Sequence, residues 1–126
     1  MSRPVVFSDA EVTLRSLAGA MAAQGVGAVV VLGPDGPSML VTEHDIVVAL
    51  SHGADPDASW GADAASRELL TADPDDTILD AVRIMAAVNV RHLPVLAGTE
   101  VIGMVSARDV LRLLAFSSSG GYPLSD

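Results

Sequence analysis

Two short segments combine a hydroxyl side chain with an acid three residues later, Thr42-Glu43-His44-Asp45 and Ser106-Ala107-Arg108-Asp109. This spacing suits a helix N-terminus, where the hydroxyl caps a free backbone N–H and the acid answers the helix dipole. The same geometry can bind a ligand, because unpaired N–H groups attract an anion and the carboxylate can accept hydrogen bonds from sugar hydroxyls. The residues alone leave both interpretations open, a helix cap and a nucleotide-type site.

Other chemistries find little support in the sequence. The absence of cysteine excludes a disulfide scaffold, a thiolate metal site and a cysteine nucleophile. The spacing of His44, His52 and His92 matches no recognised set of metal ligands, so we predict no metal site. No serine has a nucleophile-elbow context and no glycine-rich phosphate loop is present. We therefore predict no catalytic residues, no enzyme activity and no cofactor other than a regulatory ligand.

Composition and charge narrow the class of protein further. The chain has 126 residues, of which 50% are hydrophobic and only 3% aromatic, so its core must use aliphatic side chains. Its net charge of −9 opposes binding to nucleic acids and to anionic membranes. The uncharged run Leu17–Gly33 is short and lacks basic flanks, and the N-terminus carries no secretory pattern. We expect a soluble, cytoplasmic protein.

The elements that must position the two segments come from an internal repeat. Shifting the chain by 64 residues aligns Ser2–Leu50 with Ser66–Leu114 without a gap, and 13 of the 49 pairs are identical. Both acids and both helix starts are among these pairs, as Asp45/Asp109 and Thr13/Thr77. The sequence therefore contains two copies of one supersecondary unit.

Each copy predicts the order β-α-β-β-α. Hydrophobic residues at helical spacing follow each threonine, and continuous apolar runs indicate strands covered on both faces. In the first copy the predicted strands are Pro4–Phe7, Ala28–Leu32 and Ser38–Val41, and the helices are Thr13–Gln24 and Glu43–Leu50. In the second copy the strands are Glu68–Thr71, Leu93–Leu96 and Val101–Val105, and the helices are Thr77–Val88 and Ala107–Leu114.

The domain organisation follows from these ranges. We predict a first repeat over residues 1–54, a linker over 55–66, a second repeat over 67–116 and a flexible tail over 117–126. A unit of about 50 residues buries too little surface alone, so the two copies should pack on each other. The expected fold class is α/β (α+β), with the two repeats related by pseudo-twofold symmetry.

The repeated motifs resemble a known family. The strand Leu93-Pro94-Val95, the segment Ile102–Val110 and the first-copy segment Val41–Val47 are similar to the cystathionine-β-synthase-type (CBS) domain. The resemblance runs from Arg3 to about Ala115 and includes the duplication itself. It implies a tandem pair of CBS domains, or Bateman module, which is a regulatory unit that binds adenosyl ligands in the cleft between the copies.

The resemblance also implies roles for individual residues. Asp109 and Asp45 would hold ribose hydroxyls, and Ser106 and Thr42 would contact ribose or phosphate. Met104 and Leu40 would lie against the base. The phosphates would face Arg91, His92 and Arg108, with His44 standing at the first-copy position that matches Arg108.

The two copies differ at the residues that would bind phosphate. Arg91 and His92 are replaced by Gly27 and Ala28 in the first copy, and five of the seven arginines lie in the second half of the chain. A pair of arginines suits the planar recognition of phosphate. We therefore predict one good site around Asp109 and a weak or vacant site around Asp45.

Three functions remain open at this point. The first is a non-catalytic sensor, homodimeric, that binds AMP, ADP or ATP between its repeats and signals to a regulated protein partner. The second is a ligand-free dimerisation or docking module, in which the two hydroxyl–acid pairs only cap helices. The third is a sensor of S-adenosylmethionine, which has no phosphate and would not need the arginines.

Overall fold

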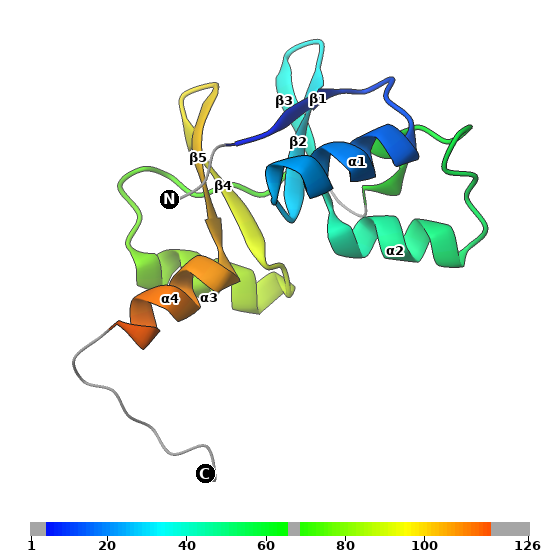
Figure 1. Ribbon diagram of the computed structural model, residues 1–126. Coiled ribbons are helices and arrows are strands. Elements are labelled where there is room, and N and C mark those ends of the chain that lie inside the picture. Colours follow the sequence, from blue (N-terminus) through cyan, green and yellow to red (C-terminus); the bar gives the residue numbers. More distant parts are fainter. Residues whose placement is uncertain (1–4, 66–68, 117–126) are drawn as a thin grey trace, which may run out of the picture.

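The computed structural model describes residues 5–65 and 69–116 (Figure 1). The first repeat consists of β1 (Phe7–Asp9), α1 (Leu14–Gln24), β2 (Ala28–Gly33), β3 (Gly36–Thr42) and α2 (Glu43–Ser51). A short 3-10 helix, η1 (Gly61–Ala64), follows it. The second repeat contains α3 (Ile78–Val88), β4 (His92–Ala97), β5 (Glu100–Ser106) and α4 (Ala107–Ala115). This is the mixed α/β fold that the sequence predicts.

The hairpins and first helices of the two repeats match each other at equivalent residues. In both antiparallel hairpins the strand register shifts at equivalent places, between Val31 and Leu32 in β2 and between Val95 and Leu96 in β4. The first helices also end alike, in left-handed residues that terminate a helix, Gly25 in one copy and Asn89 in the other. Each of these pairs is separated by 64 residues, so the structure confirms the duplication.

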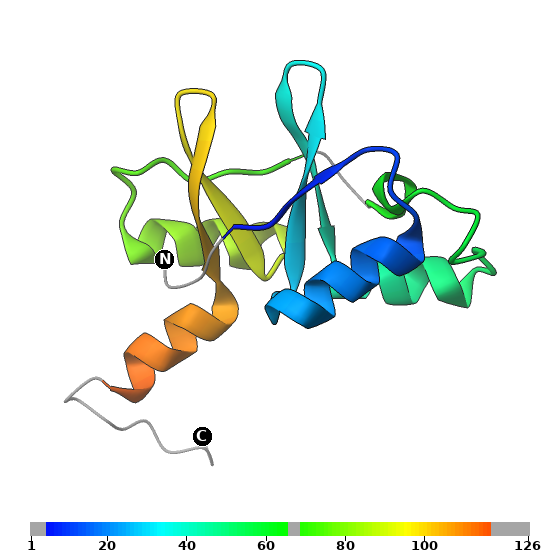
Figure 2. The same cartoon turned by 45° about the horizontal axis from the view of Figure 1, so that its top comes forward.

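Three clusters of buried residues hold the molecule together. One cluster lies within each repeat, between its hairpin and its helices, and includes Val29 and Val31 in the first. The third joins the repeats, where Ala28 and Val30 of β2 pack with Val101 and Met104 of β5. Alternate residues of β2 thus face its own helices and the other repeat, which explains the continuous apolar run. The two hairpins stand side by side (Figure 2).

The first strand of each repeat departs from the prediction. β1 begins at Phe7, where the predicted strand ends, and pairs in parallel with β2. In the second repeat only Ala72 forms the equivalent parallel bridge, with Val95. The strand stops there because Asp73 opens a turn, in which its side chain accepts a hydrogen bond from the Asp75 backbone N–H at 2.9 Å. Pro4 and Glu68 lie outside the described residues.

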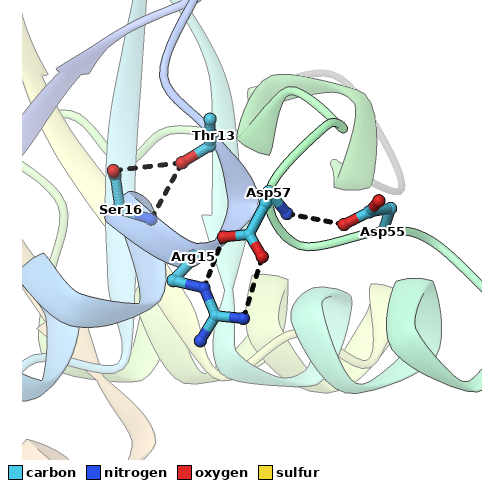
Figure 3. A network of polar contacts seen from close by, with 5 residues as sticks. All are labelled: Thr13, Arg15, Ser16, Asp55 and Asp57. Carbon is cyan, nitrogen blue, oxygen red and sulfur yellow. Dashed lines mark hydrogen bonds and ion pairs between the residues drawn. The ribbon is translucent and has the colours of Figure 1, made fainter.

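The segment predicted as a linker has structure of its own over residues 55–65. Its backbone binds the start of α1, where the Leu14 and Arg15 N–H groups donate to the Ser59 and Pro56 carbonyls, both at 2.9 Å. Arg15 also forms an exposed ion pair with Asp57 (Figure 3). Ala62 is buried in the core of the first repeat. The segment therefore covers one side of the first repeat rather than only connecting the two. The predicted tail over 117–126 lies outside the described residues.

Within residues 5–65 and 69–116, no helix is both long enough and apolar enough to cross a membrane. The run Leu17–Gly33 is divided between the end of α1 and the strand β2. Its apolar side chains serve the core of the first repeat and the contact between repeats.

Candidate functional site

A cavity of about 510 Å³ opens where the two repeats meet. The second repeat lines it with the start of β4, with Met104 of β5 and with the first turns of α4. The first repeat contributes Val5, the end of α1, the start of β2 and Glu43, the first residue of α2. The end of α1 and the start of α4 face each other below the hairpins (Figure 2). The volume is within the range of small-molecule sites.

The start of α4 is fixed by a reciprocal cap. The Ser106 hydroxyl accepts a hydrogen bond from the Asp109 backbone N–H at 3.0 Å, and the Asp109 carboxylate accepts one from the Ser106 N–H at 3.1 Å. Ser106 is buried and Asp109 is partly buried, and both line the cavity. The capping interpretation of this pair is therefore correct, and the cap also holds the carboxylate at the wall of the cavity.

The predicted residues of the second repeat gather around this one cavity. Met104 of β5 lines the cavity, and so do Arg91 and His92 at the start of β4. A hydrogen bond of 2.8 Å from the Ala107 N–H to the Arg91 carbonyl ties that strand to the start of α4, where Arg108 follows. The structure thus brings together six predicted residues, which are Arg91, His92, Met104, Ser106, Arg108 and Asp109.

The four predicted residues of the first repeat lie elsewhere. Thr42 and Asp45 form the same reciprocal cap on α2, but Asp45 is only 6% exposed and neither residue lines the cavity. His44 is exposed on α2. Leu40 packs against the cluster that joins the two repeats. A separate hollow of about 350 Å³ lies between α1, α2 and residues 54–64, and none of the predicted residues lines it.

His92 is a titratable group of the cavity whose pKa is lowered in the folded protein. Burial lowers the pKa of His92, the Glu43 and Asp109 carboxylates act in the opposite direction, and Arg91 lowers the pKa further. The imidazole is therefore neutral at pH 7. It points toward the first repeat, because a Cβ added to Gly27 would stand 2.9 Å from His92 Nε2.

The first-repeat wall of this cavity was not predicted from the sequence. Gly27 and Ala28 line it, although in the alignment of the copies they appear only as lost binding residues. The missing side chain at Gly27 makes room for the His92 ring. Glu43 also lines the cavity and was not among the predicted residues. In the sequence, Glu43 is marked only by its position between Thr42 and Asp45, and this position does not indicate which cavity its side chain lines.

The chain is similar in sequence to the CBS domain and to two curated proteins. A family model described as the CBS domain matches residues 62–116. An uncharacterised protein of Methanopyrus kandleri is 30% identical over 88% of this chain, and this chain covers 58% of that protein. A mitochondrial CBS domain-containing protein of Arabidopsis thaliana is 33% identical over 73% of the chain. The chain thus spans about half the length of these curated relatives, 58% and 48% respectively.

Solved structures resemble the chain over nearly its whole length. A CBS-domain protein of Agrobacterium tumefaciens has a TM-score of 0.80 and 29% identity, with coverage of 87% of this chain and 84% of that one. A CBS-domain protein of Pyrobaculum aerophilum, solved in complex with AMP, has a TM-score of 0.81 and 28% identity. That match covers 94% of this chain and 89% of the other. Both likenesses extend across the two repeats.

Proposed function

This chain belongs to the CBS-domain family as a tandem pair of CBS repeats, and from this premise we propose that it is a regulatory module that binds an adenosyl nucleotide in the cavity between them. The observation that carries the proposal is the set of side chains at that cavity. Asp109 would bind the ribose hydroxyls, Arg91 and Arg108 would bind phosphate, and Met104 would contact the base. The similar protein solved with AMP supports this ligand class.

The proposed module is not an enzyme. The ligand would contact both repeats, because the cavity is lined by β4, β5 and α4 on one side and by residues 25–28 and Glu43 on the other. A ligand that prefers one relative arrangement of the repeats would shift the population toward it. A protein partner that reads this arrangement would then respond to the nucleotide. The Asp45 position would be a weak or vacant site, since Asp45 is only 6% exposed and does not line the cavity.

A thermal-shift panel with AMP, ADP, ATP, NAD and S-adenosylmethionine tests the ligand class. A ligand present at a hundred times its Kd stabilises a protein by about 2.7 kcal/mol, which raises the Tm of a domain of this size by several degrees. We expect such a rise with an adenine nucleotide. An unchanged Tm with every ligand, after removal of any co-purified nucleotide, would contradict the proposal. A rise with S-adenosylmethionine alone would favour the phosphate-free alternative.

Asp109→Ala tests the ribose contact, and the chain provides a matched control. Asp80 caps α3 through the same pair of hydrogen bonds, at 2.9 and 3.1 Å, but α3 does not line the cavity. Each substitution removes the acid of one capping box, and with it the hydrogen bond that this carboxylate accepts from the backbone N–H of the capping residue. It should therefore lower the unfolding free energy by about 1 kcal/mol. Only Asp109→Ala should weaken nucleotide binding in calorimetry, by at least tenfold. Asp45→Ala should have a smaller effect on binding. Equal affinity in Asp109→Ala and Asp80→Ala would exclude the ribose assignment.

A second function, self-association, is favoured by the surface of α4. No residue of α4 is buried, and its large apolar side chains are exposed, together with Phe116 just beyond the helix (Leu111, Leu113, Leu114 and Phe116). Its counterpart α2 buries Ile46 and contacts η1. Several large apolar side chains exposed on one helix are typical of interaction sites. We propose that a second copy of the chain covers α4 in a symmetric homodimer, since a twofold axis pairs the same patch with itself.

A further inference from the structure

Glu43 of the first repeat adds a negative charge to the cavity that Arg91 and Arg108 of the second repeat also line. We infer that this carboxylate limits the number of phosphates the site accepts, so that a nucleoside monophosphate binds in preference to a di- or triphosphate. The inference rests on the proposed function, in which Arg91 and Arg108 bind phosphate. It goes further by assigning selectivity to a residue of the first repeat.

The position of Glu43 follows from the backbone contacts of the first repeat. Its N–H donates to the Gly27 carbonyl at 3.0 Å, which ties the start of α2 to the start of β2. A Cβ on Gly27 would stand 3.6 Å from Glu43 Oε1 and 2.9 Å from His92 Nε2. The carboxylate and the imidazole thus meet beside Gly27, on the wall that the first repeat supplies. A ligand that fills the cavity from the arginines toward this wall approaches Glu43.

The charges that line the cavity balance one another. Among the described residues at its wall, Arg91 and Arg108 are cationic and Glu43 and Asp109 are anionic. His92 adds no charge at pH 7, because burial disfavours its protonated form. A monophosphate carries a charge of about −1.5 to −2 at pH 7, which the two arginines can offset. We expect the charge of each further phosphate to be repelled by the Glu43 carboxylate, which lines the same cavity as the two arginines.

Repulsion between like charges acts against an anionic ligand in such a site. A cleft with low-dielectric walls screens charges less than bulk water does, and like charges placed together across an interface are costly enough to exclude a partner. Glu43 is exposed at the rim, so its effect on binding should also decrease as salt is added. The fold therefore uses an acid from one repeat to restrict what the arginines of the other can bind.

The test compares Glu43→Gln with Glu100→Gln. Both substitutions remove one negative charge, but Glu100 opens β5 at the tip of the hairpin and does not line the cavity. Calorimetry would measure the Kd of AMP, ADP and ATP for the wild type and both variants, in buffer with a chelator that removes divalent cations. We expect wild type and Glu100→Gln to bind AMP at least tenfold more tightly than ATP. In Glu43→Gln this preference should narrow by about tenfold, through tighter binding of ATP.

The outcomes separate the inference from the proposed function. If AMP binds and the preference over ATP is unchanged in Glu43→Gln, the role of Glu43 is wrong and the adenosyl site stands. If the wild type binds AMP, ADP and ATP with equal affinity, the role of Glu43 is likewise wrong and the adenosyl site stands. If S-adenosylmethionine binds more tightly than AMP, a phosphate-selective site is wrong. If no adenosyl compound binds the wild type, the proposed function itself is overturned.

Discussion

Asp109 and Ser106 serve two purposes with one set of atoms. Their reciprocal hydrogen bonds satisfy backbone N–H groups at the start of α4. The same bonds hold the Asp109 carboxylate at the cavity wall. Thr42 and Asp45 make the same cap on α2 without reaching that cavity. A capping motif and a ligand-binding motif are therefore identical in local geometry. The two motifs differ in what lies beside them, because Ser106 and Asp109 line the cavity together with residues of the other repeat, whereas Thr42 and Asp45 do not line it.

His92 gives the molecule a pH dependence that can be predicted from its environment. Burial lowers its pKa in the folded state, so the unfolded chain binds a proton more readily than the folded one. The stability that depends on the neutral ring is complete above the ordinary pKa of about 6.5 and decreases as the pH falls toward the lower folded-state pKa. We expect the unfolding free energy in urea to be lower at pH 5.5 than at pH 7.5.

His92→Gln should reduce this pH dependence, because glutamine does not titrate in this range. His44→Gln is the matched control, since His44 is exposed on α2. It should retain the wild-type difference between the two pH values. An NMR titration that gave the His92 ring a pKa at or above 6.5 would contradict the prediction.

At the scale of elements, the segment over residues 55–65 acts as an additional layer on the first repeat. It bonds to the start of α1 through the backbone and buries Ala62 against the core. The fit is closest at Gly61, whose N–H donates to the Val12 carbonyl at 2.7 Å. A Cβ on Gly61 would stand 2.6 Å from Leu17 Cδ2 and 3.3 Å from the Val12 carbonyl oxygen. The absence of a side chain is what allows this approach.

Gly61→Ala should therefore lower the unfolding free energy by about 1–3 kcal/mol, the usual cost of adding atoms to a packed site. Gly19→Ala is the control within the same repeat, because Gly19 lies inside α1 and a Cβ there would meet nothing within 4 Å. That change should raise the unfolding free energy by about 0.5–1 kcal/mol through helix propensity. Urea denaturation measures both, and effects of equal sign would show that the segment does not pack as described.

At the scale of the whole molecule, two features extend beyond a single repeat. The repeats are joined by Ala28, Val30, Val101 and Met104, which form a continuous apolar contact between the hairpins. The helix α4 runs from the end of β5 away from the first repeat (Figure 1). Its side chains Leu111, Leu113 and Leu114 are exposed. The first feature contributes Ala28 and Met104 to the cavity wall, and the second provides the surface that we propose a second copy covers.

Leu114→Glu tests this dimer. Leu114 is 63% exposed on α4, so the substitution should leave the fold intact but bring two like charges together across the proposed twofold axis. Sedimentation over a series of concentrations should show a dimer for the wild type and a monomer for the variant. Ile102→Glu is the control, at a 46% exposed position on β5 away from α4, and should remain dimeric. A monomeric wild type, or a variant that still dimerises, would exclude α4 as the interface.

The sequence by itself determined the elements and their duplication. Helix caps, hydrophobic spacing and turn residues act within a few positions of one another, so Thr13, Thr42, Thr77 and Ser106 marked the helix starts correctly. The same local signals fixed the hairpins to within one or two residues. These local signals failed where contacts with distant parts of the chain determine the structure. Examples are the second-repeat strand, which is reduced to a bridge at Ala72, and the structured segment over residues 55–65.

Which residues share a cavity depends on how the two repeats pack. Gly27 and Glu43 belong to the first repeat, yet they face His92, which is far from both in the sequence. No local pattern encodes that juxtaposition, because it depends on how the two hairpins pack through residues that carry no functional signal themselves. For the same reason the sequence could not show that Asp109 lines the cavity while the identically capped Asp45 is buried elsewhere.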